Sequence, residues 1–331
     1  MRVLVLGGTV FLGRHVVEAL LARGHEVTIF HRGKRGRELF PGVERVLGDR
    51  TTDLDRLPAG ARWDAVVDTS GYVPGVVATS AAALRDRANR YVFVSSVSVY
   101  DISAPRIDES SPMPELPDGA SREVMVPETY GPLKRLCELA ASAAFGAERT
   151  FVVRPGLIVG PHDPTDRFTY WPLRFARGGD IVVPDDLDAA VQWIDVRDLA
   201  AFVVDAIEGG LSGEVNAVGP AAPATLRELL GACAAATDAP SRIVPVDLAT
   251  LKERGVEGWS DLPVWAALGE GHDGIAHVDP AHAIALGLRH RALAETVADT
   301  LRWAQRERGG DPLKAGLTPE REAELLATAV C

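Results

Sequence analysis

Cysteine is scarce in this sequence of 331 residues, which contains only Cys137, Cys233 and Cys331. The three lie far apart, so they predict neither a disulfide framework nor a zinc site. Such cysteine usage is typical of a reducing compartment. We therefore expect a cytoplasmic protein that binds no metal.

Positive charge is also in short supply, because 46 Asp and Glu outnumber 35 Lys and Arg and give a formal net charge of −11. This balance disfavours a nucleic acid or an anionic membrane as the main partner. The sequence has no uncharged apolar run of membrane-spanning length, and its first residues have the pattern of a core strand rather than of a signal peptide. We expect a small-molecule substrate, and neither a nucleic-acid nor a membrane partner.

Apolar residues are plentiful, at 47% of the chain, and the length suits one large α/β domain or two joined domains. Residues 3–6 form a short apolar run typical of a strand buried on both faces. Apolar residues then recur at helical spacing over 16–21, and a second apolar strand follows at 27–31. This pattern predicts one βαβ unit.

The turn inside this unit reads Gly7-Gly8-Thr9-Val10-Phe11-Leu12-Gly13. Gly7 permits a tight turn, Gly13 lets helix and strand pack closely, and the helix start offers free N–H groups to a pyrophosphate. Val10 stands where a middle glycine would let the backbone approach the ligand. The turn predicts dinucleotide binding, and the alternative is a purely structural turn.

The end of the second strand is expected to select the cofactor. NAD sites usually carry a carboxylate there, whereas NADP sites carry Arg for the 2′-phosphate. This chain has His31 and Arg32, followed by Lys34 and Arg35, with no carboxylate before Glu38. We predict a preference for NADP (NADPH) over NAD, with Arg32 as the main contact; the alternative is a solvated basic loop.

Three further apolar strands are predicted at 43–47, 65–67 and 91–94, and helical patterns lie between them. This alternation predicts a Rossmann-type doubly wound parallel sheet, in which ligands bind beyond the carboxyl ends of the strands. Small polar clusters follow these strands. Asp49 and Arg50 are candidates for the adenine end of the cofactor and Thr69, Ser70 and Gly71 for its ribose and phosphates, unless they serve only as turn residues.

A catalytic group is predicted after residue 100, where the regular alternation of strands and helices is interrupted. Residues 101–127 are rich in proline, serine and acids and predict a loop over the site, after which a helix begins with Tyr130 and Lys134. Residues four apart lie on one helix face, and an ammonium group near a phenol lowers its pKa. Such a phenol can exchange a proton with a substrate oxygen that Ser96 could hold.

Five motifs follow one another between Gly7 and Ala200: Gly7-Gly8-Thr9-x-Phe11-Leu12-Gly13, Val94-Ser95-Ser96-x-Ser98-Val99-Tyr100, Tyr130-x-x-x-Lys134, Arg154-Pro155-Gly156-x-x-x-Gly160-Pro161 and Ile194-Asp195-Val196-Arg197-Asp198-Leu199-Ala200. Together they resemble the extended or atypical branch of the short-chain dehydrogenase/reductase superfamily, the NAD-dependent epimerase/dehydratase family. The resemblance implies that Tyr130 is the general acid/base and that Ser96 binds the reacting oxygen. It also implies that Lys134 holds the nicotinamide ribose and lowers the tyrosine pKa, and that Pro155 and Gly156 flank the nicotinamide.

Two departures from the family pattern matter. Val10 replaces the middle glycine, as in atypical members that include chloroplast stem-loop RNA-binding proteins. Leu157 and Val159 stand where nucleotide-sugar enzymes typically have Asn and Tyr. A site without that amide and phenol offers fewer hydrogen bonds to a polar substrate.

Aromatic residues are few overall, at 6%, but gather in residues 161–193. This part, with about 221–280, predicts a smaller C-terminal domain that caps the substrate. We expect His162, Trp171, Gln192 and Trp193 to line its pocket, and the alternative is that the aromatics form this domain's own core.

The remaining boundaries follow from this division. Residues 1–160, about 194–220 and 281–310 are assigned to the nucleotide-binding domain, so the helix at 293–303 should pack on the sheet. Residues 256–274 are either a second lid or a surface excursion, and residues 311–331 form a terminal helical tail.

The combined pattern predicts an NADPH-dependent carbonyl reductase of a small or medium metabolite, either a monomer or a homodimer. One alternative is an NAD-dependent epimerase or dehydratase of a nucleotide sugar. Another is a non-catalytic protein that senses a dinucleotide or binds RNA.

Overall fold

Short runs of branched apolar residues form the strands of a seven-stranded parallel sheet, with the order β10-β6-β5-β4-β1-β2-β3. The computed structural model describes residues 1–266, 271 and 273–329, so parts of the predicted lid at 256–274 and of the tail lie outside the described residues. The sheet's strands are β1 (Arg2–Leu6), β2 (Glu26–His31), β3 (Glu44–Leu47), β4 (Trp63–Asp68), β5 (Ala88–Val94), β6 (Thr150–Pro155) and β10 (Gly213–Ala217).

Both faces of this sheet are covered by helices, because alternate side chains of each strand point to opposite faces. Val3 and Val5 pack with α1 (Phe11–Ala22) and α5 (Val196–Gly209). Leu4 and Leu6 belong to the core beneath α2 (Pro74–Leu84) and α3 (Tyr130–Phe145). The predicted Rossmann-type doubly wound fold is therefore confirmed.

The strand order reverses beside β1, which has β2 on one side and β4 on the other. In a doubly wound sheet, ligands bind in the crevice at this switch point, beyond the carboxyl ends of the strands. The turn over residues 7–13 and the segment 69–71 follow β1 and β4 at this edge. The architecture therefore places the predicted cofactor segments together.

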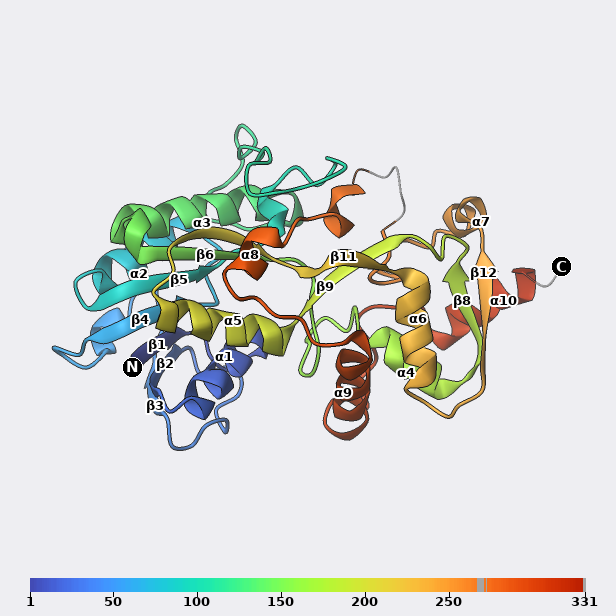
Figure 1. Ribbon diagram of the computed structural model, residues 1–331, viewed down its shortest axis with the longest axis horizontal. Helices are drawn as coiled ribbons and strands as arrows, with labels where there is room; N and C mark the ends of the chain where they lie inside the picture. The colour runs from blue at the N-terminus through green and yellow to red at the C-terminus, as the bar shows by residue number, and fades with distance from the viewer. Residues whose placement is uncertain (267–270, 272, 330–331) are drawn as a thin grey trace.

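A second unit lies beside the first (Figure 1). One small sheet has the order β11-β9-β7, and the strands β12 and β8 pair in parallel in another. Its elements are β7 (Ile158–Val159), α4 (Tyr170–Arg177), β8 (Gly179–Pro184), β9 (Ala190–Asp195), β11 (Gly219–Thr225), α6 (Leu226–Ala235), β12 (Ser241–Val246), α7 (Leu248–Glu253), α9 (Leu293–Arg306) and α10 (Pro319–Ala329). No helix in the described part of either unit has both the length and the apolar character needed to cross a membrane.

The placement of α9 corrects one prediction. Its apolar stripe packs against α4 and α6, and Val297 belongs to the core of the second unit rather than to the sheet domain. The start of the predicted segment 281–310 does contact the large sheet, through the short α8 (Ala281–Ala285) at β10 and through Leu288, which belongs to the core of the sheet domain. The periodicity correctly predicted an amphipathic helix, but a stripe of valine and leucine does not specify its partner. The terminal helix α10 also joins the second unit, where its buried Glu322 pairs with Arg174 of α4 at 2.7 Å.

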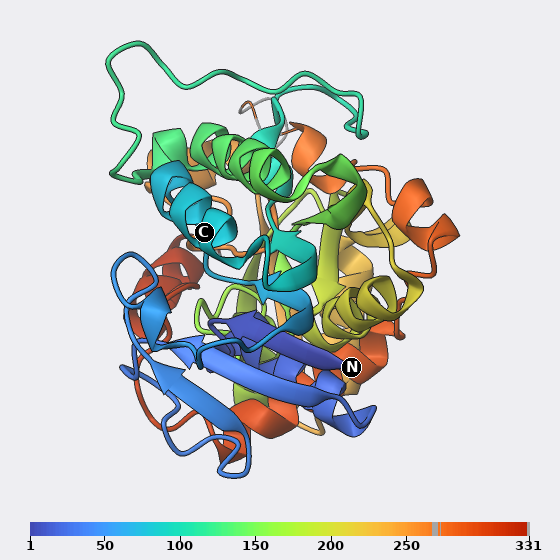
Figure 2. The ribbon, with the colours of Figure 1, turned by 90° about the vertical axis from the view of Figure 1, so that its left-hand side faces the viewer.

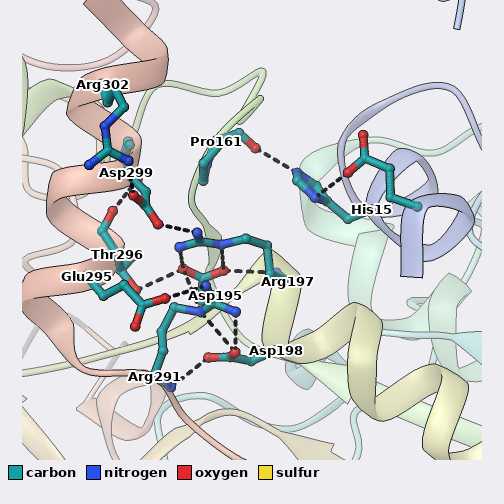
Figure 3. A network of polar contacts seen from close by, with 12 residues as sticks. His15, Pro161, Asp195, Arg197, Asp198, Arg291, Glu295, Thr296, Asp299 and Arg302 are labelled. Carbon is teal, nitrogen blue, oxygen red and sulfur yellow. Dashed lines mark hydrogen bonds and ion pairs between the residues drawn. The ribbon is translucent and has the colours of Figure 1, made fainter. Parts of the chain in front are cut away.

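An ion-pair network fixes α9 to the start of α5 (Figure 3). Asp195 caps α5 by accepting the N–H of Arg197, and it also accepts the hydroxyl of Thr296 at 2.8 Å. Arg291, just before α9, pairs with Asp198 at 2.8 Å. These charges are largely buried, so the network sets how the two units sit against each other.

The segment before α3 is a long irregular loop, as predicted. Between the 3₁₀ turns Val97–Val99 and Pro127–Thr129 it forms no helix and no named strand, and it runs past α3 at the top of Figure 2. A β-bridge between Ile107 and Val278, together with a hydrogen bond from Gly274 N–H to the carbonyl of Ile102, attaches it to the segment that precedes α8. The loop therefore links the two units above the sheet.

Candidate active site

The glycine turn after β1 has the shape that a phosphate group requires. Gly7 and Gly8 have φ of +114° and +83°, and a Cβ on Gly13 would lie only 2.7 Å from the nitrogen of Gly8. Val10 has an extended φ of −133° and a side chain that is 42% exposed, so a branched residue fits there without filling the turn. Helix α1 begins at Phe11, and the side chain of its N-cap residue Val10 does not cap the N–H groups of the first turn. The turn therefore fits the pyrophosphate of a dinucleotide.

Two further residues, Leu12 and Thr9, connect the glycine turn to the structure around it. Leu12 is buried in the core between the sheet and α1. The Thr9 hydroxyl lies 3.5 Å from Nδ1 of His31, which also accepts the N–H of Gly33 at 3.3 Å. Burial lowers the pKa of His31, as do nearby arginines, so the ring is neutral near pH 7. His31 thus ties the basic loop to the phosphate turn.

The basic loop after β2 presents unpaired positive charge. Arg32 and Lys34 are exposed and form no ion pair within the described residues. Hydrogen bonds from Thr51 and the charges of Arg32 and Lys34 lower the pKa of Asp49. The side chain of Asp49 thus lies within the electrostatic reach of this loop, at the end of β3.

Arg50 has a different environment from the one predicted. Its guanidinium donates to both carboxylate oxygens of Asp68, at 2.7 and 2.6 Å, and also to the hydroxyl groups of Ser70 and Ser80. The Asp68 carboxylate is fully buried and also accepts the Tyr91 hydroxyl. This side chain neutralises a buried charge, and the expectation that Arg50 contacts the adenine end of the cofactor stays a prediction.

The segment after β4 lies against the end of β1. The hydroxyl groups of Thr69 and Ser70 donate to the carbonyl of Leu6 at 3.1 and 3.2 Å. A Cβ on Gly7 would lie 2.4 Å from Oγ1 of Thr69, so the two segments are in close contact. The carbonyl of Gly71 accepts the Lys134 ammonium at 2.7 Å and thereby connects this segment with α3.

Ser96, Tyr130 and Lys134 converge at the carboxyl end of β5. The Lys134 ammonium, buried in the protein, also donates to the carbonyl of Val94 at 2.6 Å, two residues before Ser96. Ser96 Oγ accepts the N–H of Ser98 at 3.1 Å, which holds the serine at the end of the strand. Hydrogen bonding with Ser96 acts on the Tyr130 phenol, which is partly exposed. These three side chains line one small region next to Gly71.

The pKa of Tyr130 shifts in the direction opposite to the one predicted. Burial raises the pKa of the phenol, and hydrogen bonding with Ser96 and the charge of Arg167 lower it most, whereas Lys134 was expected to lower it. The Lys134 ammonium is held by two main-chain carbonyls, and burial lowers its own pKa to about 8. The phenol is therefore protonated at neutral pH.

Two contacts fix α3, which carries Tyr130 and Lys134. A Cβ on Gly131 would lie 1.9 Å from the carbonyl oxygen of Ser98, so the helix start rests directly on the backbone that follows Ser96. One helical turn after Lys134, Glu138 forms a buried ion pair with Arg154 of β6 at 2.8 Å. These contacts hold the tyrosine and the lysine in register with the strand ends.

The predicted nicotinamide segment is packed closely as well. Pro155 ends β6, and a Cβ on Gly156 would lie 2.9 Å from the side chain of Val218. Leu157 is buried in the core of the second unit. The segment is therefore rigid and leads from the sheet into the second unit.

The four predicted substrate residues do not gather at one site. Trp171 is wholly buried and donates to the carbonyl of Pro263 at 2.7 Å, so for this residue the core alternative is correct. His162 packs between the rings of His15 and Trp303, at 5.4 and 5.2 Å. It therefore lies between α1 and α9.

The other two predicted substrate residues line cavities in the second unit. The Gln192 amide exchanges two hydrogen bonds with the backbone of Val278 and borders a cavity of about 20 Å³ beside Trp259. Trp193 borders a cavity of about 180 Å³ whose lining includes none of Ser96, Tyr130 and Lys134. The residues that line these two cavities do not include Tyr130.

Tyr72 and Arg167 are close to the predicted catalytic residues and were missed by the sequence reasoning. The Tyr72 ring lies 6.5 Å from that of Tyr130 and 5.2 Å from the Lys134 ammonium. Arg167, from the loop after β7, acts electrostatically on Tyr130. The sequence could have predicted Tyr72, because this residue directly follows the polar cluster at 69–71. It gives no such indication for Arg167, which lies 37 positions beyond Tyr130 in an irregular loop.

Comparison with known proteins agrees with this geometry. The model of the NAD dependent epimerase/dehydratase family matches residues 3–219. The chain belongs to this family. The epimerase/dehydratase family member described here is accordingly an NAD(P)-dependent oxidoreductase of the short-chain dehydrogenase/reductase type, which favours an enzyme over a non-catalytic binding protein.

Individual relatives of this family member are distant but cover most of it. It is 29% identical to the epimerase family protein SDR39U1 of Bos taurus over 264 residues, or 73% of this chain and 83% of that protein. It is 29% identical to the 2-alkyl-3-oxoalkanoate reductase of Stenotrophomonas maltophilia over 260 residues, or 72% of this chain and 77% of that protein. The crystal structure of human SDR39U1 with NADPH shares the fold, with a TM-score of 0.60, 24% identity and coverage of 91% of this chain and 99% of the other.

Proposed function

We propose that this protein reduces the carbonyl group of a small or medium metabolite with NADPH, and that Tyr130 is the general acid. The observation that carries the proposal is the placement of Ser96, Tyr130 and Lys134 together at the carboxyl end of β5, beside the end of β4. A phenol in this position can give its proton to the oxygen of a carbonyl that Ser96 holds, as reduction requires. A relative that covers 72% of the chain is named as a reductase of a 3-oxo acid, which agrees with this direction.

Each residue has one part in the proposed reaction. The Ser96 hydroxyl orients the carbonyl oxygen by a hydrogen bond, and Tyr130 transfers its phenolic proton to the same oxygen. The glycine turn at residues 7–13, Arg32 and Lys134 would hold the cofactor, with Asp49, residues 69–71 and residues 155–156 beside it. When bound, NADPH supplies the hydride.

The preference for NADPH rests on the loop after β2. A 2′-phosphate needs a positive partner, and Arg32 and Lys34 are exposed and without ion pairs in the described part of the chain. His31 ties this loop to the phosphate turn through Thr9. Both features support binding of the ribose phosphate at this position.

The test is a Tyr130→Phe variant, measured for cofactor binding by calorimetry and for turnover with a panel of ketones by the loss of NADPH absorbance. We expect unchanged NADPH affinity and a loss of turnover of about 10²-fold or more. Full turnover by a folded variant would refute the role of Tyr130. The alternative within the family, epimerisation or dehydration of a nucleotide sugar, predicts product formation with no net consumption of NADPH.

A further inference from the structure

The half-buried Arg167 differs from the other inward-facing arginines of this protein. Arg50, Arg154, Arg174 and Arg308 each bind a carboxylate, at distances of 2.6 to 2.8 Å. Arg167 forms no ion pair anywhere in the described ranges, although burial lowers the pKa of its guanidinium. A partly desolvated cation without an anion is costly, so a ligand that supplies the anion would be favoured.

The side chain of Arg167 is oriented by neighbours that leave its outer nitrogens free. Its Nε donates to the hydroxyl of Thr165 at 3.3 Å, and that hydroxyl donates to the Asp163 carboxylate at 2.7 Å. The guanidinium carbon lies 5.3 Å from the ring centre of Trp259. Its two terminal nitrogens make no hydrogen bond within the described residues, and this pair of donors matches the two oxygens of a carboxylate or phosphate.

The charged groups around Arg167 do not replace such a ligand. Asp163 attracts the guanidinium, but it bonds to Thr165 instead, and burial raises the pKa of its carboxyl group. Asp166 is engaged with Arg308 at 2.8 Å. The other ionisable group that acts on Arg167 is the Tyr130 phenol. Since Arg167 and Tyr130 act on each other electrostatically, the guanidinium lies within electrostatic range of the phenol that would protonate the carbonyl.

The backbone that carries Arg167 and Trp259 is held in unusual conformations. His162, Asp166 and Trp259 have φ of +71°, +61° and +66°, values that side-chain-bearing residues seldom adopt. The loop is fixed from outside, because the N–H of Lys314 donates to Asp166 and its ammonium to the carbonyl of Pro164. Such over-determined strain is common at ligand sites, where it pre-organises a contact.

We propose that the guanidinium of Arg167, supported by Thr165 and stacked on Trp259, binds an anionic oxygen group of the substrate, a carboxylate or a phosphate, close to the carbonyl that Tyr130 protonates. This inference rests on the proposed function and names its substrate class as anionic oxo compounds. Thr165 is a positioning residue in this scheme, since it aims the guanidinium and does not touch the substrate.

The test compares a charged ketone with its neutral counterpart in binding, without turnover. The NADP⁺ complex is titrated by calorimetry with 3-oxooctanoate, with its methyl ester, and with dihydroxyacetone phosphate. We expect one of the two anions to bind about tenfold to a hundredfold more tightly than the ester. The anion that does so identifies the group as carboxylate or phosphate.

Variants assign this preference to Arg167. Arg167→Leu should abolish the tighter binding of the anion over the ester. Arg167→Lys should retain a part of this difference in affinity, and Thr165→Val should reduce it. Arg62→Leu is the matched control. Arg62 is exposed directly before β4, at the end of the sheet opposite the carboxyl ends of the strands, and its guanidinium donates a hydrogen bond to the carbonyl of Asp86. We expect this control to bind as the unchanged protein does.

Three outcomes would overturn the inference: equal affinity for anion and ester, an anion preference that survives in Arg167→Leu, or binding of neither anion at millimolar concentration. Titration of Tyr130→Phe separates this inference from the proposed function. We expect that variant to keep the anion preference while it loses turnover. Turnover that persists in Tyr130→Phe would refute the proposed function, whereas the role of Arg167 is decided by the binding data.

Discussion

The buried ammonium of Lys134 makes the stability of the cofactor-free protein depend on pH in a predictable way. Burial lowers the pKa of Lys134 from its ordinary value of 10.5 to about 8. Each pKa unit corresponds to about 1.4 kcal/mol, so the buried charge costs the folded state about 3 kcal/mol below pH 8. Between pH 8 and 10.5 the unfolded chain binds more protons than the folded one, and the free energy of unfolding therefore rises with pH.

The variant that isolates this effect is Lys134→Met, which keeps a similar stem and removes the amine. It leaves the carbonyl groups of Gly71 and Val94 without their donor, at about 1–3 kcal/mol each, while it removes the charge penalty. At pH 7 the two effects largely offset each other. From pH 7 to pH 10 the unchanged protein should gain about 2–3 kcal/mol relative to Lys134→Met.

Urea unfolding of the cofactor-free proteins at pH 7, 8, 9 and 10 measures this difference. Other groups titrate at alkaline pH, but they are common to both proteins and cancel in the comparison. Lys34→Met is the matched control, because Lys34 is exposed and its variant should follow the unchanged protein. Parallel stability curves for Lys134→Met and the unchanged protein would refute the reasoning, since they would mean that the ammonium is not desolvated.

Three further substitutions test the cofactor loop, the helix contact and the second core. Arg32→Ala should weaken NADPH binding about tenfold or more and leave NADH binding nearly unchanged in calorimetric titrations, because only NADPH carries the 2′-phosphate. Gly131→Ala should destabilise the protein by about 1–3 kcal/mol in thermal unfolding and lower kcat/KM, since its Cβ would lie 1.9 Å from the carbonyl oxygen of Ser98. Trp171→Ala should cost about 3–5 kcal/mol in urea unfolding but leave KM unchanged, because the indole is wholly buried and bonded to Pro263.

Each of these has a clear opposite outcome. Equal losses for both cofactors in Arg32→Ala would remove the argument for NADPH. A Gly131→Ala protein with unchanged stability and turnover would mean that α3 can move away from the strand end at little cost. A raised KM in folded Trp171→Ala would mean that this side chain contacts the substrate rather than serving only in the core.

The local patterns of the sequence were sufficient to predict the Rossmann-type sheet and the family. A short apolar strand, a glycine turn and a helix of fixed spacing are properties of neighbouring residues, and backbone geometry leaves them few alternatives. The same holds for Tyr130 and Lys134, whose common helix face follows from their spacing of four.

Long-range contacts were beyond the reach of these patterns. The side chain of Arg50 was expected at the cofactor but neutralises Asp68, and α9 was expected on the large sheet but packs on α4 and α6. An amphipathic stripe or a positive charge does not determine which of several possible partners it finds. That choice depends on the shape and charge of the whole molecule.

Neighbouring residues specify the strands, turns and helix faces of the nucleotide-binding unit, and they were enough to predict Ser96, Tyr130 and Lys134 as its catalytic groups. The direction of the Tyr130 pKa shift and the placement of Arg167 on Trp259, which follows it by 92 positions, depend on the tertiary structure. A pKa is set by burial and by charges that distant segments bring close. An unpaired guanidinium can be recognised only when the ion-pair partners of the carboxylates around it are known.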